Sequence, residues 1–176
     1  MKELDELTVR RAAKKDEHAF KILYDYYAPF VWRVVYKTVN GDHDEAVEIV
    51  QETFIRVYRS LNAFSFNSGL STWIYRIAFN TAKSFILKRR KRSTITEFDD
   101  EKYWNNKNDV AHETKDLVEF LLDKLSPSDR FILTSREIEG ITFEELSEIT
   151  GKSSEALRTK VSRIKGLLRA EASSIK

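Results

Sequence analysis

Apolar side chains recur at helical spacing along most of this 176-residue chain. Between residues 17 and 39 they fall three or four positions apart, which predicts a long helix with one buried face. Asp16 is placed to cap this helix, and Asn40 and Gly41 end it because both residues tolerate left-handed backbone angles. The predicted buried positions are Phe20, Leu23, Tyr27, Phe30, Val31 and Val34.

The same period predicts two more helices before residue 92. One begins at Asp44, and the other, capped by Ser71, covers residues 72–91. Between them, residues 62–71 break the period and predict a loop. The buried stripe of the first helix is Val47, Val50, Phe54, Val57, Tyr58 and Leu61, and that of the second is Ile74, Ile77, Ala78, Thr81 and Phe85.

The second half of the chain is organised differently. Residues 93–113 are polar, acidic and aperiodic, which predicts a flexible linker between two domains. Four shorter helical patterns follow, at residues 114–124, 127–139, 142–150 and 154–171. Because prolines and glycines are few, we expect an all-α protein of two small helical domains, at 1–92 and 114–176, the second a four-helix helix-turn-helix module.

The last two helical patterns have the form of a helix-turn-helix. Thr142 and Glu145 can form a capping box, and residues 150–153 supply a tight turn. In the final helix the predicted buried stripe is Ala156, Leu157, Val161, Ile164 and Leu168, and the opposite face holds Arg158, Thr159, Ser162, Arg163 and Lys165. Arginine and hydroxyl groups suit the major groove, so this face predicts binding to duplex DNA. The alternative is a plain helical hairpin with a solvated charged face.

Charge is unevenly distributed, although the formal net charge is only +2. Residues 83–92 carry six basic side chains and no acidic one, and residues 152–176 carry seven basic and two acidic ones. Between these blocks, residues 93–116 carry seven acidic and three basic side chains. Either basic block alone would fit a solvated helix face, but each adjoins a motif suited to nucleic acid.

The two later helices of the N-terminal domain present different predicted surfaces. Carboxylates interleaved with apolar side chains on the helix from Asp44 indicate a protein partner, because carboxylates repel phosphate. The side chains on this surface are Glu45, Glu48, Ile49, Gln51, Glu52 and Ile55. An aromatic ring among cations and an amide on the next helix favours single-stranded nucleic acid, because rings stack on bases. That row is Trp73, Arg76, Asn80 and Lys83, although Trp73 and Tyr75 would also suit a helical core.

Residues 48–58 (EIVQETFIRVY), followed by residues 71–80 (STWIYRIAFN), resemble the extracytoplasmic-function (group IV) sigma factors of bacterial RNA polymerase. The resemblance extends over about residues 8–92 and 114–172, in the family's order and spacing. It implies a protein that binds core polymerase, recognises the promoter minus-ten and minus-thirty-five elements and promotes DNA melting. It also implies an anti-sigma factor as a partner.

The resemblance and the residue patterns described above together assign three sets of residues. The clamp helices of the largest polymerase subunit would be bound by Glu48, Ile49, Gln51, Glu52 and Ile55. A flipped-out base of the minus-ten element would be taken by the loop and the next helix, through Phe64, Ser65, Phe66, Asn67, Ser68, Trp73, Tyr75, Arg76, Asn80 and Lys83. The minus-thirty-five element would be read by Arg158, Thr159, Ser162, Arg163 and Lys165.

Other features narrow the class of protein. The chain has no cysteine, its three histidines are scattered without metal-ligand spacing, and no phosphate-binding glycine loop is present, so we expect no catalysis, metal or cofactor. Without an apolar leader or a membrane-length apolar run, we expect a cytoplasmic protein, monomeric when free. Two alternatives stay open: a stand-alone helix-turn-helix regulator, and a protein-interaction module whose basic faces meet an acidic partner.

Overall fold

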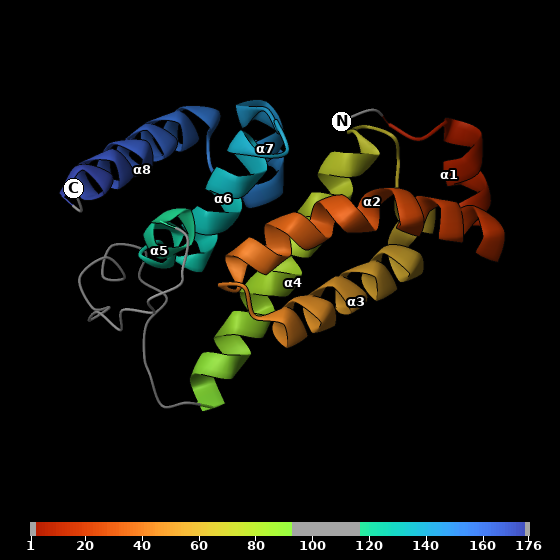
Figure 1. The fold of residues 1–176 in the computed structure, drawn as a ribbon. Coiled ribbons are helices and arrows are strands. Elements are labelled where there is room, and N and C mark those ends of the chain that lie inside the picture. Colours follow the sequence, from red (N-terminus) through yellow and green to blue (C-terminus); the bar gives the residue numbers. More distant parts are fainter. Residues whose placement is uncertain (1–2, 93–116, 175–176) are drawn as a thin grey trace.

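A computed structural model describes the backbone of residues 3–92 and 117–174, and the side chains of residues 3–89 and 120–173. Within these ranges the chain forms helices and no strand, so the predicted all-α class is confirmed (Figure 1). The flexible linker predicted at residues 93–113 lies outside the described residues, as do the side chains of residues 90–92 in the first basic block.

The N-terminal unit consists of four α-helices and one short 3₁₀ helix. They are α1 (Glu6–Ala13), α2 (Glu17–Thr38), α3 (His43–Ser60), η1 (Leu61–Ala63) and α4 (Leu70–Arg92). The predicted cap of α2 is confirmed, because the Asp16 carboxylate accepts a hydrogen bond from the Ala19 backbone N–H at 3.0 Å. Asn40 and Gly41 both have positive φ after its end, as predicted.

Three details of this unit differ from the sequence predictions. Helix α1 was not predicted. Helix α3 begins one residue earlier than expected, because Asp42 caps it through a 3.0 Å bond from the Glu45 N–H. Ser71 is not a cap, because α4 begins at Leu70 and already includes this serine in its first turn.

The C-terminal unit consists of α5 (Leu117–Asp123), α6 (Pro127–Glu137), α7 (Phe143–Thr150) and α8 (Ser154–Ser174). The capping box at the start of α7 is present, with the Thr142 hydroxyl on the Glu145 N–H and the Glu145 carboxylate on the Thr142 N–H. Gly151 then turns the chain with a φ of 74°. These features confirm the predicted helix-turn-helix, with α7 and α8 as its two helices.

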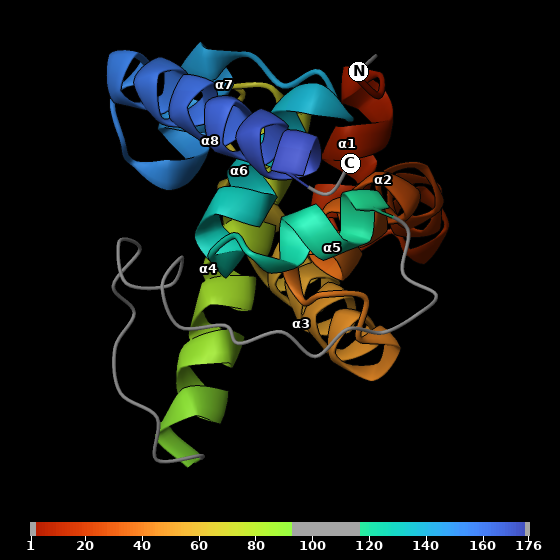
Figure 2. The same cartoon turned by 60° about the vertical axis from the view of Figure 1, so that its left-hand side comes forward.

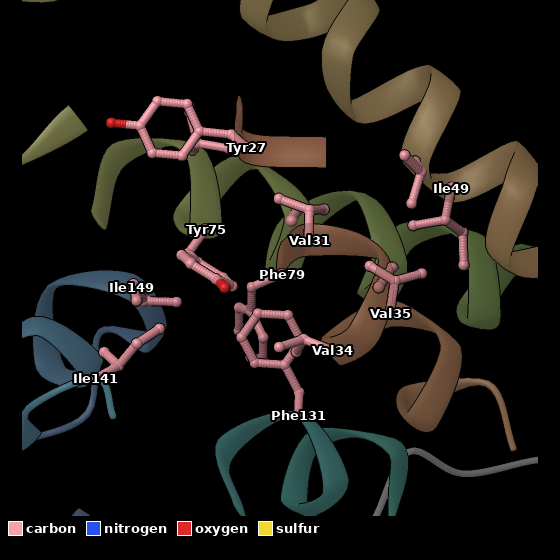
Figure 3. Close-up of a cluster of buried hydrophobic side chains, with 14 of the residues drawn as sticks. Tyr27, Val31, Val34, Val35, Ile49, Tyr75, Phe79, Phe131, Ile141 and Ile149 are labelled. Atoms are coloured by element: carbon pink, nitrogen blue, oxygen red, sulfur yellow. The ribbon is translucent and has the colours of Figure 1, made fainter. Parts of the chain in front are cut away.

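The two units pack directly against each other, which the sequence did not predict. Helix α4 lies against α7, and α2 lies against α6, so that one apolar core runs through both units (Figures 1 and 2). Phe131 of α6 is its central side chain: its ring centroid lies 5.0 Å from that of Phe79 and 6.5 Å from that of Tyr75, both on α4. Ile141 and Ile149 approach Tyr75 from the other side (Figure 3).

An ion pair and several hydrogen bonds also join the two units at this contact. Arg33 of α2 donates two hydrogen bonds to the Glu139 carboxylate, at 2.7 and 2.9 Å, and the Glu139 side chain is buried. Those hydrogen bonds raise the pKa of the Arg33 guanidinium, so the ion pair persists across the physiological range. Arg130, which is fully buried, donates to the backbone oxygen of Leu125 at 3.1 Å and to the Asn40 side chain.

Replacing Phe131 with alanine removes the side chain around which the two units pack. Because the ring is 1% exposed, Phe131→Ala should lower the free energy of unfolding by about 3–5 kcal/mol. Ile138→Ala, at a position that is 56% exposed just beyond α6, is the matched control and should change it by about 0.5 kcal/mol or less. Urea denaturation of the full chain measures both. Equal losses for the two variants would contradict the interdomain contact.

Candidate nucleic-acid and protein interfaces

The loop between η1 and α4 and the first turn of α4 carry three aromatic side chains in mutual contact, called here the aromatic cluster: Phe64, Phe66 and Trp73. The Phe64 ring centroid lies 4.8 Å from that of Phe66 and 5.4 Å from that of Trp73. Phe64 is buried at the base, while Phe66 is 39% exposed at the rim. Phe66 also has a φ of 59°, a strained conformation for a residue with a side chain. The cluster therefore presents one ring edge or face to solvent.

Most of the other predicted minus-ten residues are exposed near this cluster. Ser65 and Asn67 are exposed and Ser68 is half-buried. Arg76, Asn80 and Lys83 are exposed at helical spacing along α4, so they share one face as expected. Among the described residues, no hydrogen bond engages the Asn80 amide. An exposed amide and cations on the helix that also bears Trp73 can hold the base and the phosphates of a single strand.

Tyr75 does not belong to this surface. It is 1% exposed and points into the interdomain contact, where its ring lies against Phe131 (Figure 3). Burial raises the pKa of the Tyr75 hydroxyl well above its usual range, and that hydroxyl has no hydrogen-bond partner among the described residues. The alternative noted from the sequence, that Tyr75 is a core residue, is the correct one.

The predicted protein-binding face of α3 is only partly exposed. Glu48, Gln51 and Ile55 point to solvent and Glu52 is half-buried. The prediction that Ile49 is exposed is wrong, because its side chain is 0% exposed. Helix α3 packs against both α2 and α4, so its buried face is wider than the predicted stripe. The residues that α3 buries are Ala46, Ile49, Val50, Thr53, Phe54 and Val57.

A groove of about 500 Å³ connects this face of α3 with the second half of α4. Its walls carry both signs of charge, with Glu52 paired to Arg56 at 2.7 Å and Glu45 paired to Arg89. The lining residues are Glu48, Gln51, Glu52, Ile55, Arg56, Thr81, Ser84, Phe85, Lys88 and Arg89. Sequence reasoning identified only the α3 wall, because the α4 residues join it through tertiary packing. A groove with charged rims and the apolar floor of Ile55 and Phe85 suits a helix of another protein.

The predicted duplex-binding residues on the outer face of α8 differ in whether they form an ion pair within the protein. The Arg158 guanidinium is held by Glu144 of α7, at 2.6 Å, and lies 5.3 Å from the centroid of the Phe143 ring. Lys165 pairs with Glu137 at 2.8 Å. Arg163 is exposed, and no ionic partner for it occurs among the described residues. Arg163 is therefore the arginine of this face whose donors are available without breaking an ion pair.

The start of α8 borders a shallow hollow of about 480 Å³. It is lined by Ser153, Glu155, Ala156, Thr159, Lys160 and Arg163. The prediction that Ala156 is buried is wrong: it is exposed in this hollow, while Leu157, Val161 and Ile164 form the buried stripe. The capping bond of Ser153 to the Ala156 N–H, at 3.2 Å, fixes the first turn. The small alanine leaves room for a base or backbone to approach.

Helix α1 is the part of the neighbourhood that sequence reasoning missed. Its residue Arg10 lies over the Phe66 ring, 4.7 Å from the ring centroid. The sequence does contain a pattern that predicts this helix. Asp5 caps it by accepting a hydrogen bond from the Thr8 N–H, and the buried Val9 and Ala12 fall at helical spacing.

Neither a membrane-spanning helix nor a metal-binding group occurs in the part of the chain that the structure describes. No helix there has both the length and the apolar character needed to cross a bilayer. No group of three or more acidic, histidine or cysteine side chains within the same ranges is arranged to hold a metal ion.

Comparison with known families gives matches in both units. The family described as Sigma-70 region 2 matches residues 23–92, and the family described as Sigma-70, region 4 matches residues 115–168. The first match contains α3, the aromatic cluster and α4, and the second contains the helix-turn-helix. Helix α1 lies outside both.

Curated proteins match over nearly the whole chain. The RNA polymerase sigma-H factor of Pseudomonas aeruginosa is 30% identical over 179 residues, covering 92% of this chain and 90% of that protein. The ECF RNA polymerase sigma-E factor of Escherichia coli strain K12 is 29% identical over 173 residues, covering 90% of this chain and 89% of that protein.

Two solved structures share the fold. CnrH, in complex with the cytosolic domain of CnrY, superposes with a TM-score of 0.72 at 18% identity, covering 98% of this chain and 99% of that chain. The sigma factor RpoE from Bartonella quintana, in complex with the anti-sigma factor NepR, gives a TM-score of 0.68 at 20% identity, covering 86% and 94%.

The orientation of α3 can be tested through its two isoleucines. Ile49→Ala should lower the free energy of unfolding by about 2–5 kcal/mol, because it opens a cavity between α2, α3 and α4. Ile55→Ala, six residues later at a position that is 44% exposed, should lower it by about 0.5 kcal/mol or less. Thermal melts followed by circular dichroism measure both. A larger loss for Ile55→Ala than for Ile49→Ala would show that the helix is rotated from the orientation described.

Proposed function

The chain belongs to the extracytoplasmic-function group of sigma-70 RNA polymerase sigma factors, which recognise promoters and initiate transcription, and we propose that it does so through three surfaces of the described structure. The first binds core polymerase, the second captures a base of the melted minus-ten element, and the third reads the minus-thirty-five duplex. The observation that carries this assignment is the exposed Asn80 amide on the same face of α4 as Arg76 and Lys83, two helical turns beyond Trp73 of the aromatic cluster.

Base capture requires a ring to replace lost stacking, a polar group for the base edge, and cations for the backbone. Phe66 offers the exposed ring, Asn80 the amide, and Arg76 and Lys83 the cations. A base edge is open to an amide only after the base leaves the stack, so this surface favours single-stranded over duplex DNA. Unstacking costs a few kcal/mol, which the combined contacts can offset.

The groove between α3 and α4 is the proposed polymerase surface. Gln51 and Ile55 contribute its exposed polar and apolar contacts, and Glu48 and Lys88 lie at its charged rims. The clamp helices of the largest polymerase subunit are the proposed occupant. Ile49 supports this surface from beneath and does not contact the partner.

The outer face of α8 is the proposed minus-thirty-five surface. Arg163 offers a free guanidinium for bidentate bonds to guanine, with Thr159 one turn before it in the same hollow. Arg158 is proposed to reach DNA only by exchanging its Glu144 partner for a base or phosphate.

The two DNA surfaces are proposed to work with the units apart. The names of the two elements place them 35 − 10, or about 25 base pairs apart, which is about 85 Å of B-DNA. A compact chain of 176 residues has a radius of gyration of about 16 Å, so it is roughly 40 Å across. Twenty-four residues join α4 to α5 and can span roughly 80 Å when extended. Promoter binding therefore requires the interdomain contact around Phe131 to break.

Further partners and the compartment follow from the same assignment. CnrH and the Bartonella RpoE were each solved with a partner protein, in the second case an anti-sigma factor, and we propose an anti-sigma factor for this chain as well. The protein acts in the cytoplasm as a non-enzymatic subunit, monomeric when it is free of polymerase.

The stand-alone regulator is the other function that the helix-turn-helix allows. It leaves the row of Arg76, Asn80 and Lys83 and the groove beside α3 without a role, because a duplex-binding repressor needs neither. The interaction module likewise leaves Arg163 and the α8 hollow without a role. The sigma-factor assignment uses all three surfaces.

Arg163→Ala should weaken binding to a minus-thirty-five duplex by about 1–3 kcal/mol and relax selectivity at particular base pairs. The loss should be confined to those pairs, because bidentate bonds distinguish guanine from other bases. Arg169→Ala is the matched control, since it removes an exposed arginine of the same helix that lies outside the hollow. Fluorescence anisotropy on a set of single-substitution duplexes measures both. A sequence-independent loss for Arg163→Ala would assign this side chain to phosphate instead.

Asn80→Ala tests base capture directly. It should weaken binding to single-stranded minus-ten DNA by about 1–3 kcal/mol and leave binding to the minus-thirty-five duplex unchanged. A fluorescent base analogue in the non-template strand reports the step in holoenzyme, through the signal that appears when the base unstacks. If Asn80→Ala holoenzyme opened the promoter as well as the wild type, the capture surface would be misassigned.

A further inference from the structure

The N-terminal segment contacts the predicted minus-ten loop, between η1 and α4, at two places, although it lies outside the two family matches. At the end that leads into α4, the Glu3 carboxylate accepts hydrogen bonds from the Ser71 backbone N–H, at 3.2 and 3.3 Å, and from the Ser71 hydroxyl. The Tyr27 hydroxyl donates to Glu3 Oε2, one of these two oxygens, at 2.8 Å. A side chain at Gly69 would place its Cβ 3.0 Å from Glu3, so the segment and the loop are in close contact.

At the rim of the loop, the contact is between a cation and a ring. The Arg10 guanidinium lies 4.7 Å from the centroid of the Phe66 ring, whose other aromatic neighbour is Phe64 at 4.8 Å. Arg10 is itself held by Glu6, one turn earlier in α1, through bonds of 2.5 and 2.6 Å. The guanidinium is thus oriented by its own helix before it meets the ring.

Phe66 needs such support. Its φ of 59° is costly for a residue with a side chain, and its ring is 39% exposed, so neither backbone preference nor deep burial fixes its position. Contacts with the Phe64 ring and the Arg10 guanidinium supply what local preference does not. A ring held in this way can accept a base without first paying the entropy of becoming ordered.

We propose that Arg10 is a positioning residue for minus-ten recognition, which holds the Phe66 ring in the orientation that stacks on the captured base. This inference rests on the proposed function of the aromatic cluster. It extends the promoter-binding surface from the region matched by the family to helix α1. Arg10 acts through Phe66, so its effect on DNA binding depends on that ring.

A double-mutant cycle on the full chain tests whether the effect of Arg10 on DNA binding depends on the Phe66 ring. The probe is a single-stranded DNA selected by the wild-type protein from a random-sequence pool. Arg10→Ala should weaken its binding about 2- to 5-fold, the range of one exposed cation–π contact. In a Phe66→Leu background, which keeps an apolar side chain but removes the ring face, the same change should have an effect below about 1.5-fold. Equal losses in both backgrounds would overturn the proposal and assign Arg10 to direct phosphate binding.

Arg11→Ala is the matched control. Arg11 is the next residue of α1, is similarly exposed, and pairs with Asp16 at 2.7 Å instead of contacting the aromatic cluster. It removes the same charge, so it should leave binding of the selected strand within about 1.5-fold of wild type. A loss as large as that of Arg10→Ala would show a general charge effect and overturn the proposal.

Hydrogen exchange on the free protein separates this inference from the proposed function. Arg10→Ala should speed amide exchange at residues 66–68, while Arg11→Ala should not, because only the first releases the ring. Unchanged exchange in Arg10→Ala overturns the positioning role without reference to DNA. The exchange of Arg10→Ala could be faster while the wild-type protein selects no strand from the pool. That result would show that base capture is wrong, and with it the proposed role of Arg10 in binding.

Discussion

The arrangement of the whole chain depends on the packing of Phe131 of α6 against Tyr75 and Phe79 of α4. This contact joins the two units into one core, and the Arg33–Glu139 ion pair closes its edge. It also decides which faces of α4 reach solvent. The C-terminal unit covers the side of α4 that bears Tyr75 and leaves Arg76, Asn80 and Lys83 exposed. The same contact keeps the two proposed DNA-binding surfaces closer together than a promoter requires. Under that proposal, promoter binding and unfolding of the protein both require this contact to break.

Most helices and one complete motif could be predicted from sequence, because their determinants are local. The Asp16 cap, the Asn40-Gly41 end and the Thr142–Glu145 capping box act within a few residues, and each is present in the structure. The faces were harder to predict. A single apolar stripe describes a helix that packs on one side, whereas α3 contacts two neighbours and buries Ile49 as well. Tyr75 is the clearest case, because its partner Phe131 lies 56 residues away in the chain and no local pattern connects the two.

The candidate sites show the same division between local and tertiary information. Residue types on α8 and α4 identified the basic and polar rows, yet only tertiary contacts distinguish Arg158, held by Glu144, from Arg163. The groove beside α3 takes half of its wall from α4. Arg10 was missed because its importance comes from a ring 56 positions later, in a loop whose strained backbone no periodicity predicts. Strain of this kind is often found where a protein binds its ligand.

We propose that this chain directs RNA polymerase to promoters through α8, the aromatic cluster with α4, and the groove between α3 and α4. The most direct measurement is transcription by bacterial core polymerase on a randomised promoter library, with and without the protein, followed by sequencing of transcript starts. A Gln51→Ala, Glu52→Lys variant serves as the control, because it alters the polymerase surface and leaves both DNA surfaces intact. The account predicts new starts that share two upstream elements about 25 base pairs apart, and their loss with the variant. Starts that are unchanged by the protein, with any core enzyme, would contradict it.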